Sequence, residues 1–234
     1  MRFKKIPEIE DWHLVTVSPA LAPGAVHLWR IRTGDDGAAL SRQRPLLSPR
    51  EAERANRLRI RRHQARYVRA HAGLRAILTN YIDIEPQHIE FTYAKAGKPL
   101  LDGTNSDLHF NLTTSGDLAL VAISGGEPVG VDCEWVRERK DMSAIAKRMF
   151  SAEEASRIAT AEPDDRLMQF HLAWTSLEAG VKADGRGLAR HKEPATQGDL
   201  DVGHCVPEHG FMAAVARRDL PPVRDWVTLE LTPG

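Results

Sequence analysis

Two carboxylates stand two residues apart in a short apolar run, V-G-V-D-C-E-W, at residues 129–135. Successive side chains of a β-strand alternate between its faces, so Asp132 and Glu134 share one face while Cys133 turns to the other. Adjacent carboxylates repel each other unless a cation lies between them, and hard oxygen ligands suit Mg²⁺ held with substrate phosphates. The run therefore predicts either a metal-binding strand or an exposed strand whose face happens to be acidic.

Length and charge limit the class of protein. The chain has 234 residues, enough for one large domain or two smaller ones, and 42% of its residues are hydrophobic. Its 32 basic residues balance its 32 acidic residues. This balance argues against binding of nucleic acid or a membrane through the overall charge, and it leaves local basic patches open.

Cysteine usage and the amino terminus indicate the compartment. Cys133 and Cys205 are the two cysteines and lie far apart in the sequence, so neither a disulfide framework nor a zinc site is indicated. The first residues, M-R-F-K-K-I-P, lack the apolar core of a signal peptide, and no run of about 18 apolar residues occurs. We therefore expect a cytoplasmic protein in a reducing compartment.

A strongly basic helix is predicted over residues 48–80. Ser48 is a suitable N-cap, Pro49 fits the first helical position, and Glu51 three residues after the cap completes a capping box. The segment contains nine arginines and few opposing acids. Such a stripe is commonly a solvated helix face, and it also suits the recognition of phosphate groups.

Apolar and alternating runs predict the strands. They lie at residues 25–31, 89–93, 108–113, 118–124, 129–135, 211–216 and 226–232. The turn G-G-E-P between residues 118–124 and 129–135 predicts that these two strands form a hairpin. We place the boundary between an N-terminal half, residues 1–124, and a C-terminal half, residues 125–234, at this turn.

Two further helices are predicted in the C-terminal half. Ser151 opens a second capping box, S-A-E-E, which by itself accounts for Glu154 as a structural residue. A longer helix is expected to begin near Asp164 or Asp165 and to end before Gly185.

One face of this longer helix carries Thr175, Glu178 and Lys182, at i, i+3 and i+7. A surface ion pair between Glu178 and Lys182, of about 0.3–0.5 kcal/mol, is a sufficient structural explanation. The same two groups could also serve a phosphate site.

Five short motifs occur in a fixed order along the chain. They are G-K-P at 97–99, F-N-L-T-T-S-G at 110–116, G-V-D-C-E at 130–134, F-S-A-E-E at 150–154 and W-T-S-L-E-A-G-V-K at 174–182. In order and spacing they resemble the 4'-phosphopantetheinyl transferase superfamily, of the surfactin-synthetase-activating type that serves peptide and polyketide synthetases. The resemblance covers residues 48–188, and five motifs in register make it specific.

The resemblance implies an α+β fold of two similar α/β halves, related by a pseudo-twofold axis, with the active site in the cleft between them. It implies a monomeric enzyme of secondary metabolism that moves the 4'-phosphopantetheine arm of coenzyme A to a serine of an acyl, peptidyl or aryl carrier protein. Adenosine 3',5'-bisphosphate is the other product. The apo carrier would belong to a non-ribosomal peptide, polyketide or fatty-acid synthase.

The resemblance also implies roles for residues at matching positions. Asp132, Glu134 and Glu178 would hold Mg²⁺, Glu154 would be the general base, and Lys182 would meet the pyrophosphate. The implied coenzyme A contacts are Arg54, Arg66, Lys98, Thr113 and Thr114. This chemistry is coherent, because a metal and a lysine offset the charge on the departing oxygen, and a positioned carboxylate accepts the proton of the serine.

Two positions depart from the family pattern. Members usually carry a histidine where this chain has Thr114 and a lysine where it has Leu177, and each lost charge-assisted hydrogen bond would cost about 1.5–3 kcal/mol of binding. Leu177 also fits the apolar face of its helix, beside Ala173 and Val181. One alternative is a divergent, non-catalytic protein that binds carrier protein or coenzyme A. Another is a nucleic-acid-binding module built on the arginine helix, and the neutral overall charge of the chain argues against it.

Overall fold

Groups of strands and groups of helices follow one another along this mixed α/β protein. The computed structural model describes residues 6–15, 17, 19–34, 37–102, 107–195 and 198–232. The N-terminal elements are β1 (His13–Val15), β2 (Val26–Arg32), α1 (Gly37–Gln43), η1 (Arg44–Leu46), α2 (Pro49–Arg57), α3 (Arg61–Leu78), η2 (Pro86–His88), β3 (Phe91–Tyr93), β4 (Pro99–Leu101), β5 (Leu108–Ser115) and β6 (Leu118–Gly125). The C-terminal elements are β7 (Gly130–Trp135), α4 (Met142–Met149), α5 (Ala152–Thr160), α6 (Pro163–Asp184), η3 (Leu188–Arg190), β8 (Asp201–Cys205), β9 (Phe211–Arg217), η4 (Val223–Asp225) and β10 (Val227–Leu231).

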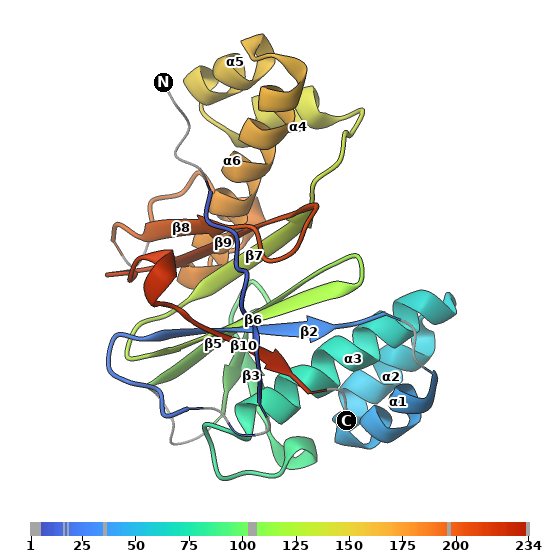
Figure 1. The fold of residues 1–234 in the computed structure, drawn as a ribbon. Helices are drawn as coiled ribbons and strands as arrows, with labels where there is room; N and C mark the ends of the chain where they lie inside the picture. The colour runs from blue at the N-terminus through green and yellow to red at the C-terminus, as the bar shows by residue number, and fades with distance from the viewer. Residues whose placement is uncertain are drawn as a thin grey trace.

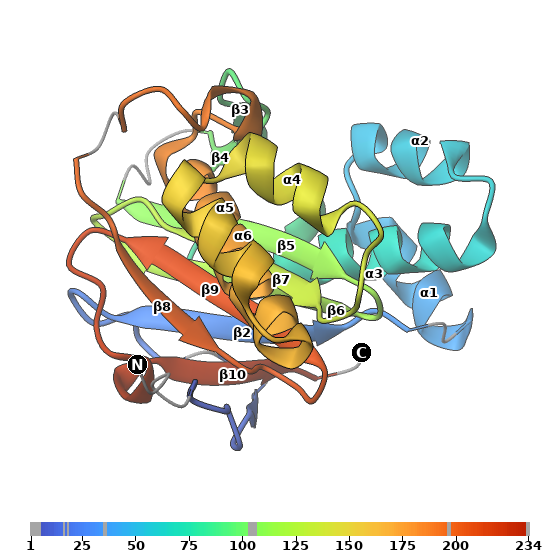
Figure 2. The ribbon, with the colours of Figure 1, turned by 90° about the horizontal axis from the view of Figure 1, so that it is seen from above.

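Two sheets lie between two groups of helices, and β3 and β4 form a separate two-stranded sheet (Figure 1). The larger sheet has the strand order β1-β10-β2-β6-β5, and the smaller has the order β7-β9-β8. Helix α3 packs on the outer face of the larger sheet, and α6 lies along the outer face of the smaller one (Figure 2). The apolar residues between the sheets include Leu28, Leu120, Val131 and Cys133. The predicted alternation in β7 is therefore confirmed, since Val131 and Cys133 face the core between the sheets.

The two parts of the chain repeat one connectivity. One part runs from β2 through α1–α3 to the antiparallel strands β5 and β6, with β3 and β4 in between; the other runs from β7 through α4–α6 to the antiparallel strands β8 and β9. In each part the last of these strands pairs with the first. Strand β10 then returns to the larger sheet and pairs in parallel with β2 and β1. The mixed α/β class is as predicted. The pseudo-twofold axis and the boundary between residues 124 and 125 stay predictions.

The single helix predicted over residues 48–80 is wrong. Leu58 and Ile60 adopt extended backbone angles, so α2 ends at Arg57 and α3 starts afresh at Arg61. The break folds the two helices onto each other, and Ala55 of α2 packs with Val68 and Ala72 of α3. No glycine or proline marks the break, which is why the sequence does not predict it.

The hairpin predicted across G-G-E-P is also wrong. Strand β6 pairs with β5 and β2, whereas β7 pairs with β9 in the other sheet. The turn therefore carries the chain from one sheet to the next. Helices α1 and α4 and strand β8 were not predicted. Gly203 interrupts the alternation of side chains in β8. A larger residue does not fit at this position, because a Cβ there would lie 2.8 Å from the ring of Trp226.

The helix ends follow the predicted signals in part. Ser48 and Glu51 make the complete capping box. Ser151 accepts a hydrogen bond from the backbone N–H of Glu154, but the Glu154 carboxylate is not part of a reciprocal box and pairs with Arg157 instead. Helix α6 ends where expected, at left-handed Gly185 with φ of 76°.

No helix in the described part of the chain is long and apolar enough to cross a lipid bilayer.

Candidate functional site

Strand β7 and helix α6 approach each other closely at Gly130. An ideal Cβ at this residue would lie 2.0 Å from the backbone oxygen of Ala179 and 2.4 Å from the backbone nitrogen of Ala183, both on α6. Only a glycine permits this contact. The glycine of the G-V-D-C-E motif therefore sets the distance between the carboxylates of β7 and the charged face of α6.

Across this contact, Asp132 and Lys182 form the centre of a charged cluster. The Asp132 side chain is 3% exposed, and its Oδ1 lies 2.6 Å from Lys182 Nζ. Lys182 Nζ also lies 3.2 Å from Glu178 Oε2. Thr113 Oγ1 donates to the same Asp132 oxygen at 3.1 Å. The predicted residues Asp132, Glu178, Lys182 and Thr113 thus lie together.

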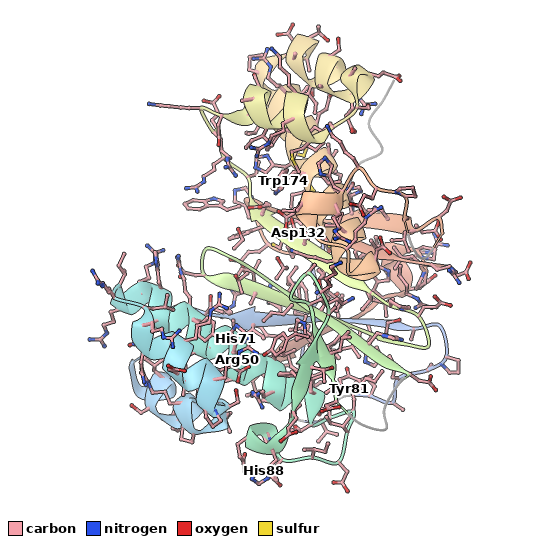
Figure 3. The ribbon with its side chains drawn as sticks, turned by 180° about the vertical axis from the view of Figure 1, so that it is seen from behind. Arg50, His71, Tyr81, His88, Asp132 and Trp174 are labelled. Carbon is pink, nitrogen blue, oxygen red and sulfur yellow. The ribbon has the colours of Figure 1, made fainter. Side chains whose placement is uncertain are left out.

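Glu134 extends the cluster along β7. Its Oε1 accepts a hydrogen bond of 3.0 Å from Trp174 Nε1, and Trp174 precedes Glu178 by one helical turn. Figure 3 shows Trp174 and Asp132 near each other where α6 crosses the smaller sheet. The spacing of four residues between Trp174 and Glu178 is the sequence signal that could have identified Trp174 as part of the site.

The carboxylates of this cluster carry excess negative charge. Burial raises the pKa of Glu178, and the charge of Asp132 raises it further, against the opposing effect of Lys182. Burial likewise raises the pKa of Glu134, with further increases from Asp132 and Glu178. Burial alone would lower the pKa of Lys182, but Asp132 and Glu178 reverse the shift and raise it. The single positive charge of Lys182 therefore neutralises only part of the negative charge of the three carboxylates.

A cation fits this donor set. The second carboxylate oxygen of Asp132, Oδ2, is buried and has no hydrogen-bond partner in the described part of the chain. Carboxylate oxygens are the ligands that Mg²⁺ prefers. Among the described residues, however, no three His, Cys, Asp or Glu side chains are arranged as a ready metal cage, and Lys182 lies against Asp132 and Glu178. The metal roles of Asp132, Glu134 and Glu178 stay predictions.

Strand β5 contributes a row of polar side chains to β7. Asn111 Oδ1 accepts from the backbone N–H of Val131 at 2.9 Å, and Ser115 Oγ accepts from that of Trp135 at 2.9 Å. Together with Thr113 they occupy alternate positions of the F-N-L-T-T-S-G motif. Asn111 and Ser115 were missed, although strand alternation places them on the face of Thr113. Thr114 points the other way and is exposed.

One cavity adjoins the cluster, and a second cavity adjoins the first. The first, of about 300 Å³, is lined by Lys98, Asn111, Glu178 and Lys182. The second, of about 140 Å³, is lined by the carboxylate of Glu51 and by basic and aromatic side chains: Arg50, Arg54, Tyr67, His71 and Tyr93. Both cavities include Gly97, Pro99 and Leu112 in their walls. Figure 3 shows Arg50 and His71 together on the α2–α3 side.

Lys98 of the G-K-P turn connects this region to α6. Its Nζ donates to the backbone oxygens of Val129, at 2.9 Å, and Ala183, at 3.3 Å. Burial lowers the pKa of Lys98 to about 8, against the charge of Asp184, which raises it. Lys98 lies in the same cavity as Lys182. Through its two hydrogen bonds it also holds the loop before β7 to the end of α6.

The two predicted arginines lie in different cavities. Arg54 stacks over the Tyr67 ring at 5.6 Å in the second cavity. Arg66 lines a separate cavity of about 380 Å³ and pairs with Asp117 there. The structure does not bring Arg54 and Arg66 to one point.

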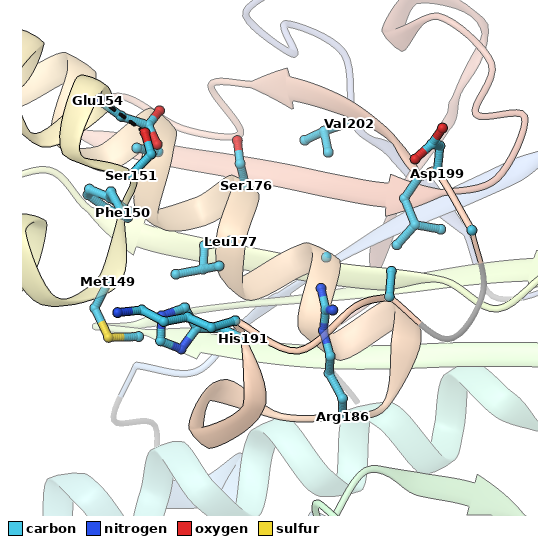
Figure 4. Close-up of a pocket in the computed structure, with 16 residues that line it drawn as sticks. Met149, Phe150, Ser151, Glu154, Ser176, Leu177, Arg186, His191, Asp199 and Val202 are labelled. Carbon is cyan, nitrogen blue, oxygen red and sulfur yellow. Dashed lines mark hydrogen bonds between the residues drawn. The ribbon is translucent and has the colours of Figure 1, made fainter.

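Glu154 lies apart from the carboxylate cluster. It lines a cavity of about 760 Å³, together with Ser151, Ser176 and Leu177 (Figure 4). Ser176 and Leu177 belong to the face of α6 that does not carry Glu178 and Lys182. Leu177 packs beside the apolar cluster of α4–α6, which supports the structural explanation of this residue.

The fold and the cluster define a mixed α/β protein with a buried carboxylate–lysine site beside two cavities with basic walls. A family model described as the 4'-phosphopantetheinyl transferase superfamily matches residues 128–207, which span β7, α4–α6 and β8. The chain is 35% identical over 205 residues to the 4'-phosphopantetheinyl transferase HetI of Nostoc sp. (strain PCC 7120), covering 82% of this chain and 86% of that protein.

More distant relatives agree. The chain is 28% identical to the 4'-phosphopantetheinyl transferase Sfp of Bacillus subtilis (strain 168), over 61% of this chain and 62% of that protein. It is 31% identical to the 4'-phosphopantetheinyl transferase AcpT of Escherichia coli (strain K12), over 59% of this chain and 70% of that protein. The chain belongs to the 4'-phosphopantetheinyl transferase superfamily, as the motifs predict.

Proposed function

We propose that this protein transfers the 4'-phosphopantetheine arm of coenzyme A to a serine of an apo carrier protein of a peptide, polyketide or fatty-acid synthase. In this reaction the serine oxygen bonds to the phosphorus of the arm. The bond from that phosphorus to the bridging pyrophosphate oxygen breaks, and adenosine 3',5'-bisphosphate leaves. Family membership supports the reaction class. The observation that carries the assignment to a site is the Asp132–Lys182–Glu178 cluster.

Asp132, Glu134 and Glu178 are the proposed ligands of Mg²⁺. The unpartnered Asp132 Oδ2 and the raised pKa values of both glutamates are the support for this assignment. A bound Mg²⁺ would supply positive charge beside the pyrophosphate. Lys182 supplies further positive charge from the protein, because its raised pKa keeps it protonated at neutral pH and its ammonium group stabilises the charge of the departing bisphosphate.

The basic cavities are the proposed site of coenzyme A. Lys98 and Lys182 share a cavity, and Arg54 lines the neighbouring one, with Tyr67 available for stacking. Thr113 is a hydrogen-bonding group within the cluster, and Thr114 lies one residue further along β5. We assign the adenosine 3'-phosphate to Arg54, whose cavity shares walls with that of Lys98 and Lys182. Arg66, the other arginine expected at this phosphate, lies in a separate cavity and does not reach the same point.

Glu154 is the proposed general base for the carrier serine. Its side chain is 34% exposed, is not held by the helix cap, and pairs with the exposed Arg157. It is therefore accessible to a hydroxyl that enters the 760 Å³ cavity. Because this cavity lies on another face of α6 from Lys182, the role requires the carrier serine to reach the cluster from the Glu154 side.

The test is incubation with coenzyme A, Mg²⁺ and a panel of apo carrier proteins, followed by intact mass measurement. We expect one carrier or more to gain one phosphopantetheine arm, and the gain to stop when EDTA removes the metal. Isothermal titration with coenzyme A, run beside it, distinguishes an inactive binder from a protein with no affinity. Binding without transfer to any carrier would favour the divergent, non-catalytic protein.

A further inference from the structure

Lys98 connects the two backbones that meet at Gly130. Its Nζ donates to the backbone oxygen of Val129, at 2.9 Å, and to that of Ala183, at 3.3 Å. Val129 directly precedes Gly130, and Ala183 is one of the α6 residues that a Cβ at Gly130 would meet. The ammonium group has three N–H donors, and these two carbonyls take two of them. Lys98 therefore bridges β7 and α6 where they lie against each other.

The end of α6 suits a cation. Ala183 belongs to the last turn of this helix, which ends at Asp184, and the carbonyls of a last turn have no N–H partner within the helix. They also carry the partial negative charge of the helix dipole. By donating to one of these carbonyls, Lys98 satisfies an acceptor that the helix itself leaves unpaired.

The turn between β3 and β4 holds Lys98 in place. Within this turn the backbone N–H of Gly97 donates to Ala94 O at 2.7 Å, and the N–H of Ala94 donates to Lys98 O at 2.9 Å. The turn also packs against the loop that follows α6, because a Cβ at Gly187 would lie 2.7 Å from the Cβ of Ala96. The Lys98 side chain therefore extends from a supported backbone to its two acceptors.

Packing alone does not fix the contact between β7 and α6. The contact at Gly130 limits how closely the two backbones approach, but it does not prevent them from moving apart. Hydrogen bonds from one ammonium group to both backbones oppose that movement. Asp132 on β7 and Lys182 on α6 meet at 2.6 Å across the same interface, so their contact depends on the alignment of the two elements.

We propose that Lys98 is a positioning residue, which keeps Asp132 and Lys182 in contact by holding β7 to α6, and that it does not bind the phosphates of coenzyme A itself. This inference rests on the proposed function, in which the Asp132–Lys182 pair serves the transfer step. Loss of Lys98 therefore slows transfer, whereas loss of a phosphate ligand would weaken the binding of coenzyme A.

The test compares Lys98→Met with Lys95→Met. Lys95 belongs to the same turn and is exposed, so its variant loses the same charge without breaking the link between β7 and α6. Intact mass measured over time with an apo carrier protein would give kcat and the KM for coenzyme A. We expect Lys98→Met to lower kcat by roughly 10- to 100-fold and to change KM by less than about threefold. Lys95→Met should match the unaltered protein in both.

Nuclear magnetic resonance supplies a readout besides activity. Trp174 on α6 donates from Nε1 to Glu134 on β7, so its indole N–H signal reports how the two elements are aligned, and its loss in Trp174→Phe identifies it. This signal should shift in Lys98→Met and stay in place in Lys95→Met. If Lys98→Met does not fold, Lys98→Gln, which is neutral and shorter than lysine, replaces it in both measurements.

Three results would overturn the proposal. A KM raised by about tenfold or more with unchanged kcat in Lys98→Met would make Lys98 a phosphate ligand. A Trp174 signal that does not move would show that Lys98 does not align β7 with α6, and an equal loss of kcat in Lys95→Met would show a general effect of charge. If the unaltered protein neither binds coenzyme A nor modifies a carrier, the proposed function fails, and the Trp174 signal still decides whether Lys98 holds the two elements together.

Discussion

Replacing Gly130 by alanine should separate α6 from β7. The new Cβ would lie 2.0 Å from Ala179 O and 2.4 Å from Ala183 N, whereas ordinary contacts begin at about 3.4 Å. The obstacles are helical backbone and cannot turn aside as a side chain would. One of the two elements must therefore move by more than about 1 Å.

We expect a loss of about 3 kcal/mol or more in the free energy of unfolding, at or above the upper end for overpacked cores. Urea denaturation followed by circular dichroism would show this as a fall of roughly 1 M in the midpoint. The 2.6 Å contact between Asp132 and Lys182 spans the same interface, so the affinity of the remaining folded protein for coenzyme A should fall as well.

Gly180→Ala is the matched control. Gly180 lies four residues before the end of α6, and a Cβ there would meet nothing within 4 Å outside the helix. Alanine should stabilise the helix by about 0.5–1 kcal/mol. If Gly130→Ala is as stable as the unaltered protein and binds coenzyme A equally well, then the close approach of α6 to β7 does not set the geometry of the site.

Four further changes test other parts of the structure. Glu154→Gln should lower turnover by roughly 100-fold or more with near-normal stability, because the carboxylate is not part of the cap; equal turnover would return Glu154 to a structural role. Thr114→His should tighten coenzyme A binding, and Leu177→Lys should lower the melting temperature without a gain in affinity, because Leu177 packs in an apolar cluster; calorimetry and thermal melts check both. Burial lowers the pKa of His27 from 6.5 to about 4, so the unfolded chain takes up a proton between pH 6.5 and 4 that the folded protein does not. The free energy of unfolding should therefore fall by roughly 2–3 kcal/mol as the pH falls across that window, and it should fall less in His27→Gln. Denaturation curves recorded across this pH range would contradict this if both proteins lost the same free energy of unfolding.

Local signals predicted the local parts of the site. The alternation of V-G-V-D-C-E-W placed Cys133 in the core and Asp132 opposite it, and the i+4 spacing placed Glu178 beside Lys182. Gly185 marked the end of α6 through its left-handed backbone. Each of these features depends on neighbours within about one helical turn or strand, so the sequence carries them directly.

The sequence did not predict features that depend on distant contacts. Residues 58–60 break the basic helix without a glycine or proline, because the gain lies in packing Ala55 against Val68 and Ala72. The partner of β7 is β9, about 80 residues away, and only the assembled sheet selects it. The separation of Glu154 from Lys182 follows from which faces of α6 meet α5 and β7, which motif spacing does not encode.

The assignment of transfer to the Asp132 cluster is tested most directly by the rate at which an apo carrier protein gains its arm. Intact mass would follow this rate for the unaltered protein and for Asp132→Asn at limiting Mg²⁺, with thermal melts to confirm folding. Loss of a residue that only contacts a metal ligand typically lowers metal affinity or activity by about 10- to 100-fold. Loss of a proposed ligand itself should cost more, so we expect the variant to transfer the arm more slowly by at least about 100-fold. A folded Asp132→Asn protein that modifies the carrier at the full rate would contradict the proposed site.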